Sequence, residues 1–143
     1  MIAAQGFCNA FATQSDLSTI LAHFSSSAEV LAFEHGLPRL APFLGRPFKG
    51  PDAIKDYFSV VAEHLSYRDM RFEEFVVDVE ASKVSARGRA TFTWKSTGQS
   101  WDEIFAYILS FDGHDKVKTY EIWADSGAAY LARTGQLTDQ GQT

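Results

Sequence analysis

The spacing of apolar residues along the chain changes near Met70. Before that point apolar side chains recur every three or four residues, which is typical of helices with one buried face. After it they alternate with polar residues, which is typical of strands in a sheet with one covered face. Helices followed by a run of strands predict an α+β domain in which the helices cover one face of an antiparallel sheet.

Three helices are predicted ahead of the sheet. The first spans about residues 3–12, and the second follows Ser15 and Asp16, whose side chains can cap a helix. The segment SSSAEVLAFEHG then predicts a loop that leads into a short strand. Residues 36–50 contain three prolines and three glycines and predict a loop. Pro51 suits the first turn of a third, amphipathic helix.

The second half of the chain predicts four strands joined by hairpins, at residues 71–80, 82–95, 100–111 and 116–125, and a short closing helix at 126–133. We expect residues 1–133 to form a single domain. The last ten residues, 134–143, have the composition of a disordered tail.

The positions of the turns predict the strand registers. A hairpin tip at Thr97-Gly98 puts Trp94 opposite Trp101, and the five-residue turn DGHDK puts Tyr107 opposite Glu121. Both registers place the same set of aromatic and acidic side chains on one face of the sheet. That face holds Gly88, Ala90, Phe92, Trp94, Trp101, Glu103, Phe105, Tyr107, Glu121, Trp123 and Asp125. Because Gly88 and Ala90 are small, we expect space above the middle of this face.

The opposite face of the predicted sheet carries an apolar patch, formed by Ile104, Ile108, Tyr120 and Ile122. An apolar patch on the outside of a sheet favours a partner surface, and a second copy of the same chain is the simplest partner. We therefore expect a homodimer through this face.

Composition narrows the classes of partner. The chain has 143 residues, a net charge of −5 and no cluster of basic residues, which argues against nucleic acid and against an anionic membrane surface. No apolar stretch approaches the length that spans a bilayer. The single cysteine, Cys8, cannot form an internal disulfide, and the N-terminus lacks a basic segment typical of a signal peptide. We expect a cytoplasmic protein.

Two short motifs resemble a known superfamily. The third helix has a glycine, an apolar residue and an aromatic pair, at Gly50, Ile54, Tyr57 and Phe58. The last hairpin has an Asp-Gly turn, an apolar residue and a terminal aspartate, at Asp112, Gly113, Val117 and Asp125. With the order of elements, these resemble the SnoaL-like or nuclear-transport-factor-2-like (NTF2-like) superfamily, which includes the ketosteroid isomerases. The segments AFEHGLPRLAPFLGRPFKG and YEIWAD together are most similar to those of small fungal SnoaL-like proteins.

The resemblance implies a cone, in which a strongly curved antiparallel or mixed sheet and its covering helices enclose a hydrophobic cavity. Some members of the superfamily catalyse proton transfers, cyclisations or dehydrations on small apolar molecules, and others only bind them.

Glu121 is the first candidate for chemistry, because a carboxylate among Trp123, Phe105 and Tyr107 would have a raised pKa and could act as a general acid or base. A structural hydrogen bond across the strands is the alternative. His35 could relay a proton from the end of the first strand, or it could bond to carbonyls of its own loop.

The remaining predicted site residues would shape the cavity and bind the ligand. They are Trp123, Phe105, Trp94, Trp101, Phe92, Tyr57, Arg39, Glu103 and Asp125. Arg39 could hold an oxyanion, whereas Glu103 and Asp125 are predicted neighbours at the rim. His23, His64 and His114 have no metal-ligand spacing, and we expect neither a metal nor a cofactor.

These features favour cofactor-independent acid–base conversion of a small apolar metabolite, of the isomerase, cyclase or dehydratase type. Glu121, Tyr107 and His35 are the expected catalytic residues. The alternative is a non-catalytic binding or dimerisation module with the same fold.

Overall fold

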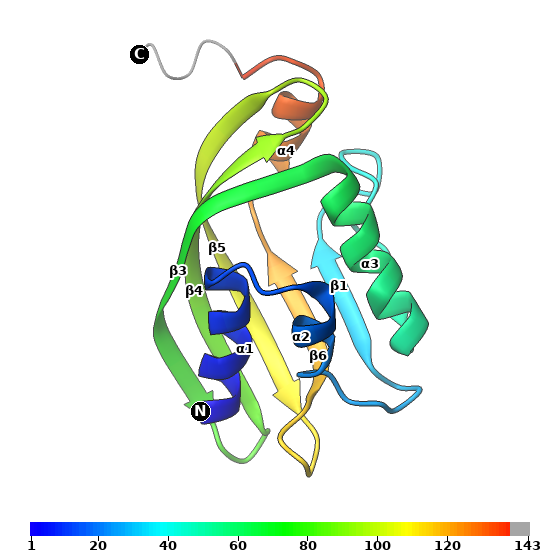
Figure 1. Ribbon diagram of the computed structural model, residues 1–143, viewed down its shortest axis with the longest axis vertical. Coiled ribbons are helices and arrows are strands. Elements are labelled where there is room, and N and C mark those ends of the chain that lie inside the picture. Colours follow the sequence, from blue (N-terminus) through cyan, green and yellow to red (C-terminus); the bar gives the residue numbers. More distant parts are fainter. Residues whose placement is uncertain (138–143) are drawn as a thin grey trace.

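The computed structural model describes residues 1–137, which form helices α1–α4 and strands β1–β6 (Figure 1). In chain order the elements are α1 (Ile2–Ala12), α2 (Leu17–Leu21), β1 (Leu31–His35), β2 (Phe48–Lys49), α3 (Pro51–His64), β3 (Leu65–Asp78), β4 (Lys83–Trp94), β5 (Gln99–Phe111), β6 (Val117–Trp123) and α4 (Ser126–Arg133). The predicted α+β class is confirmed.

The strands form one mixed sheet in the order β2-β1-β6-β5-β4-β3. Strands β1 and β6 run parallel, and every other neighbouring pair is antiparallel. The sheet curves strongly without closing into a barrel, and α1, α2 and α3 lie over its concave side (Figure 1). This arrangement is a cone.

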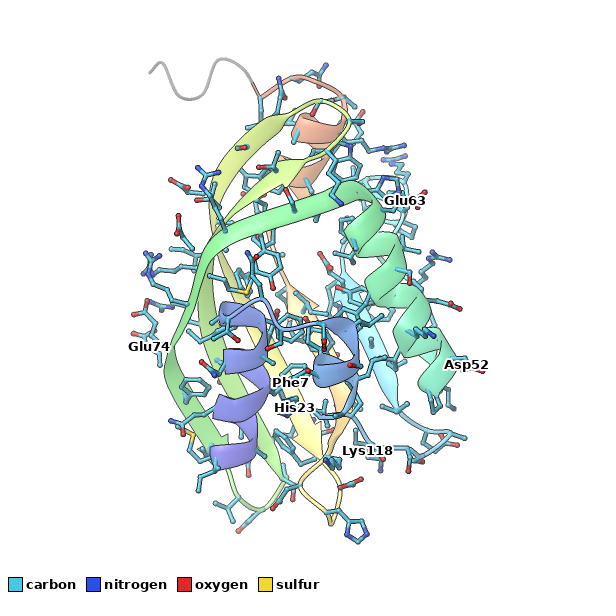
Figure 2. The ribbon with its side chains drawn as sticks, in the orientation of Figure 1. Phe7, His23, Asp52, Glu63, Glu74 and Lys118 are labelled. Atoms are coloured by element: carbon cyan, nitrogen blue, oxygen red, sulfur yellow. The ribbon has the colours of Figure 1, made fainter. Side chains whose placement is uncertain are left out.

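The N-terminal helices form where their caps and apolar faces predict them. The Asp16 side chain accepts a hydrogen bond of 2.9 Å from the backbone N–H of Thr19 and so caps α2. Pro51 occupies the first turn of α3. Phe7 of α1 (Figure 2) is fully buried. Its ring centroid lies 5.3 Å from that of Phe24 and 5.2 Å from that of Tyr120.

The β4–β5 hairpin turns one residue earlier than predicted. Gly98 has a φ of 72°, in the left-handed region that glycine tolerates, and its N–H donates to the Trp94 carbonyl at 2.8 Å. Trp94 therefore pairs with Gln99 instead of Trp101. A turn one residue earlier makes each residue of β4 pair two residues earlier along β5 than predicted. A change of two residues keeps the side chains of β4 and β5 on their predicted faces.

The predicted β5–β6 register is wrong by one residue over most of its length. Phe111 pairs with Val117 as expected, but Ser110 pairs with Thr119, so Lys118 is an extra residue that forms a bulge. Lys118 is exposed at the lower end of the sheet in Figure 2. A shift of one residue turns every following side chain to the other face. Glu121 therefore lies on the outer face, opposite Ile108.

Gly88 does not leave empty space above the sheet, contrary to the prediction. A Cβ atom on Gly88 would lie 2.3 Å from two ring atoms of Phe105, which is its pairing partner on β5. The Phe105 ring occupies the space that a side chain at position 88 would otherwise fill.

The predicted tail lies only partly within the described residues. Leu137 is half-buried, and its backbone N–H donates to Oε1 of Gln99 at 2.9 Å. Residues 138–143 of the predicted tail lie outside the described residues. Within residues 1–137, none of the helices combines the length and the apolar character needed to cross a membrane.

Candidate active site

A cavity of about 470 Å³ lies between the concave face of the sheet and helices α1 and α3. Its wall is mainly apolar and aromatic, with contributions from Phe11, Phe43, Phe58, Phe92, Trp101, Phe105 and Ile122. Its polar groups are few, and they include the side chains of Glu34, Tyr57, Glu103, Tyr107, Tyr120 and Asp125. An apolar cavity with a few convergent polar groups is typical of a small-molecule site.

Glu34 projects into the cavity from β1, the strand beside β6. Its carboxyl group accepts a hydrogen bond of 2.5 Å from the Tyr57 hydroxyl, which comes from α3. Burial raises the pKa of Glu34 to about 7, the hydrogen bond from Tyr57 lowers it, and the charge of Glu103 raises it. Glu34 can therefore hold or release a proton near neutral pH.

Glu103 is the second carboxyl group of the cavity and comes from β5. Its Oε1 accepts a hydrogen bond of 2.7 Å from Nε1 of Trp101, two residues earlier on the same face. Burial raises the pKa of Glu103 to about 7, the bond from Trp101 lowers it, and the negative charge of Asp125 raises it. Asp125 itself caps α4, since its side chain accepts from the Ala128 N–H at 2.9 Å.

Three tyrosine hydroxyls complete the polar part of the cavity. Burial raises the pKa values of Tyr57, Tyr107 and Tyr120 well above the ordinary value for tyrosine. The three hydroxyls therefore stay protonated at neutral pH and can donate hydrogen bonds to a carboxylate or to an oxygen of a ligand. The Tyr107 and Tyr120 rings pack edge to face, with their centroids 4.9 Å apart.

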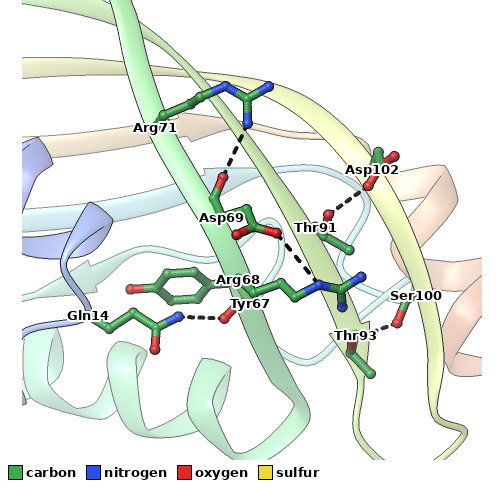
Figure 3. Close-up of polar contacts among 9 residues, drawn as sticks. All are labelled: Gln14, Tyr67, Arg68, Asp69, Arg71, Thr91, Thr93, Ser100 and Asp102. Carbon is green, nitrogen blue, oxygen red and sulfur yellow. Dashed lines mark hydrogen bonds and ion pairs between the residues drawn. The ribbon is translucent and has the colours of Figure 1, made fainter.

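One side of the cavity is bounded by the turn between α1 and α2 and by the start of β3. Nε2 of Gln14 donates a hydrogen bond of 2.7 Å to the Tyr67 carbonyl, which Figure 3 shows, and the Tyr67 hydroxyl donates to the Phe11 carbonyl at 2.8 Å. Both Gln14 and Tyr67 line the cavity. These two bonds fasten α1 to β3 and fix that wall.

The fold is shared with many solved structures. An NTF2-like protein of unknown function from Burkholderia pseudomallei superposes with a TM-score of 0.77 at 19% identity, over 92% of this chain and 95% of that one. The chain has the NTF2-like fold. A candidate SnoaL-like polyketide cyclase from a Jannaschia species gives a TM-score of 0.72 at 12% identity, over 91% of this chain and 88% of its own.

A third structural neighbour is TerC, whose structure was determined with polyporic acid. It gives a TM-score of 0.73 at 17% identity, over 91% of this chain and 94% of TerC. No protein-family model matches the sequence, and no curated protein matches it. At these identities the likeness shows the fold, and the chemistry depends on the residues of this chain.

The NTF2-like cone carries Glu121 and His35 on its outside, which corrects the prediction that they face the cavity. Nε2 of His35 lies 3.0 Å from Oε1 of Glu121, and the His35 ring stacks on Trp123 with centroids 4.1 Å apart. All three side chains come from neighbouring rungs of β1 and β6 on the outer face. The Lys118 bulge is the reason, because it reverses the faces of β6.

Two other predicted ligand-binding residues do not line the cavity. Trp94 is buried, but its ring packs against those of Phe43 and His64 at one end of the sheet. Arg39 is exposed in the loop after β1, and its carbonyl accepts a hydrogen bond of 3.1 Å from Arg133. The predicted residues that do line the cavity are Tyr57, Phe92, Trp101, Glu103, Phe105, Tyr107 and Asp125.

Glu34 is the acidic residue of the cavity that sequence reasoning missed. The segment LAFEH alternates, with Leu31, Phe33 and His35 on one face and Ala32 and Glu34 on the other. The more apolar face points outward in the structure, so hydrophobicity alone would place Glu34 on the wrong face of the sheet. In the structure Glu34 lies opposite Ile122 of the parallel strand β6, and both side chains line the cavity.

Proposed function

We propose that this protein binds a small, largely apolar molecule in the cone and converts it by general acid–base proton transfer, as isomerases, cyclases and dehydratases do. One observation carries the proposal: Glu34 and Glu103 reach the same apolar cavity from β1 and β5, and burial raises the pKa of each to about 7. A carboxyl group with such a pKa is both a competent base and a competent acid at neutral pH.

Tyrosine hydroxyls supply the second element of such a reaction. Proton abstraction beside a carbonyl group places negative charge on the carbonyl oxygen, and Tyr107 and Tyr120 can donate hydrogen bonds to it, whereas the single Tyr57 proton is already donated to Glu34. Several NTF2-like neighbours are named as candidate isomerases or polyketide cyclases, which supports this class of reaction.

Hydrogen–deuterium exchange on a neutral bicyclic ketone tests the proposal. We expect the protein to accelerate exchange of the acidic C1 hydrogens of 2-tetralone in D₂O at neutral pD, measured by ¹H NMR. The variants Glu34→Gln and Glu103→Gln keep shape and remove the titrating group, so each lowers the acceleration, on the order of 10²-fold or more for an essential acid or base.

Glu121→Gln is the matched control, because Glu121 lies on the outer face. We expect this variant to accelerate the exchange of 2-tetralone as much as the wild-type protein does. Saturable binding of 2-tetralone without accelerated exchange would instead favour the non-catalytic binding module.

We also propose that two copies of the chain associate through the outer face of the sheet. Ile104 and Trp123 are 56% and 40% exposed there, on the adjacent strands β5 and β6. The neighbouring Arg87 and Arg89 pair with Glu74 and Glu73 of β3, at 2.8 and 2.7 Å, and so leave the apolar centre without excess charge. A self-complementary apolar face of this kind suits a two-fold dimer.

The residues of this face differ from those predicted. Ile104 and Ile108 do lie on the outer face, but Tyr120 and Ile122 are buried on the concave side and line the cavity. The extra residue in β6 again accounts for the difference. Phe33, His35 and Trp123 take their places beside the two isoleucines.

A further inference from the structure

The cavity contains acidic groups without basic ones. Glu34, Glu103 and Asp125 line it, whereas no Lys, Arg or His is among its lining residues in the described chain. Glu34 and Glu103 reach the cavity from the separate strands β1 and β5, and Asp125 lies at the start of α4, where its side chain caps the helix. The nearest predicted basic candidates, His35 and Arg39, point elsewhere.

Aromatic rings surround the acidic groups. Tyr57 and Tyr120 pack edge to face with centroids 6.1 Å apart beside Glu34, and Phe92 stacks on Trp101 beside Glu103 with centroids 5.8 Å apart. The negative faces of such rings attract cations. Carboxyl groups combined with aromatic faces suit a cation within an apolar body and repel an anion.

We propose that the ligand of this cavity bears a protonated amine on an apolar body. This inference rests on the proposed function, because it specifies the molecule that the same cavity binds. The ammonium group would lie between Glu34 and Glu103 and supply the positive charge that the wall lacks. A ligand with a carboxylate or phosphate group would place an unpaired negative charge beside two carboxyl groups in an apolar site, which is costly.

Proton release on binding distinguishes a cation from a neutral ligand. Glu34 faces Tyr57 of α3, Tyr120 of β6, and Tyr107 and Glu103 of β5, and none of these carries positive charge. Glu103 faces Trp101 on its own strand and Asp125 at the start of α4. A bound ammonium group favours the ionised carboxylates, so the pair releases up to about one proton near pH 7.

Three probes with one bicyclic skeleton test the proposal: 2-aminotetralin as the cation, 2-tetralol as the neutral isostere and tetralin-2-carboxylate as the anion. Isothermal titration calorimetry at pH 7, in two buffers of different ionisation enthalpy, measures both affinity and protons released. We expect the amine to bind at least tenfold more tightly than the alcohol, with proton release, and the carboxylate to bind more weakly than both.

The double variant Glu34→Gln/Glu103→Gln should remove the preference for the amine and the proton release. Glu121→Gln, on the outer face, should keep both. If the variant does not fold, proton release by the unchanged protein still decides the question. Equal affinities for amine and alcohol, or amine binding without proton release, would overturn the inference.

The failure of this inference is separable from the failure of the proposed function. Equal binding of alcohol and amine, together with accelerated exchange of 2-tetralone, leaves acid–base conversion of a neutral molecule in place. If none of the three tetralin probes binds, the charge preference and the binding of small apolar molecules both fall.

Discussion

The Tyr57 hydroxyl donates a 2.5 Å hydrogen bond to Oε1 of Glu34 and so joins α3 to the neighbouring strand β1. Both side chains are buried, so this bond is the main compensation that Glu34 has for its lost hydration. Through it the helix that covers the sheet controls the acidity of a carboxyl group on the sheet. The stability and the chemistry of the cone are therefore linked at this pair.

Removal of the Tyr57 hydroxyl should raise the pKa of Glu34 further above about 7. The bond from Tyr57 favours the ionised carboxylate and lowers its pKa, so Tyr57→Phe leaves burial unopposed. A ¹³C NMR titration of the glutamate carboxyl carbons measures the change. We also expect the variant to lose about 1–3 kcal/mol of unfolding free energy at pH 8, where Glu34 is largely ionised.

Tyr67→Phe serves as the control for that titration, because the Tyr67 hydroxyl donates to the Phe11 carbonyl instead of a carboxyl group. The pKa of Glu34 should not change in this variant. An unchanged or lower pKa of Glu34 in Tyr57→Phe would contradict the role assigned to the hydrogen bond.

The unfolding free energy should fall as the pH rises from about 5 to 8. Burial raises the pKa values of Glu34 and Glu103 from the ordinary glutamate value of 4.5 to about 7. Between these values the folded chain binds protons that the unfolded chain has lost, so stability is fully present below about 4.5 and is lost as the pH passes 7. The change is up to about 3 kcal/mol for each carboxyl group, as an upper bound.

Urea denaturation at several pH values checks this trend, with Glu34→Gln/Glu103→Gln as the matched variant. Burial lowers the pKa of His23, which adds stability as the pH rises through about 6.5 and opposes the trend. The difference between the two proteins removes this contribution. If the unfolding free energy changed equally with pH in both proteins, burial would not raise the pKa values of the two carboxyl groups.

Gly88→Ala should destabilise the fold by about 1–3 kcal/mol, because the new methyl group would overlap the Phe105 ring. Gly113→Ala is the control, since a Cβ at that turn position meets nothing within 4 Å. In the background Phe105→Leu the cost of Gly88→Ala should shrink. Urea denaturation of the unchanged protein, the two single variants and the double variant gives the coupling free energy between positions 88 and 105. A coupling free energy near zero would contradict the contact.

Apart from β2, which lies within the loop predicted at residues 36–50, the sequence predicted the order of the elements because their signals are local. Asp16 and Pro51 mark helix starts, and the alternation after Met70 marks strands. The faces of β4 and β5 were also predicted, since a shift of two residues keeps the faces. Thus the pattern alone placed Glu103 and Tyr107 on the concave face, although Glu103 is buried in the cavity instead of lying at the predicted rim.

The rest of the site depends on one residue that no local signal marks. Lys118 forms the bulge in β6, and a bulge there reverses the faces of Glu121 and Trp123. The apolar alternation of Tyr120 and Ile122 was the available clue, because both are nearly fully buried. The predicted register puts Glu121 inside and therefore places Tyr120 and Ile122 in an outer patch.

The outer face offers the last prediction. Ile104→Glu should convert a dimer into a monomer, because a two-fold axis would bring two like charges close together in an apolar contact. Ile104 is 56% exposed in the single chain, so the substitution should change the fold's own stability little. Size-exclusion chromatography with light scattering measures the mass. Val79→Glu, an 82% exposed position in the turn between β3 and β4, should leave the mass unchanged. A monomeric mass for the unchanged protein at tens of micromolar would refute the dimer.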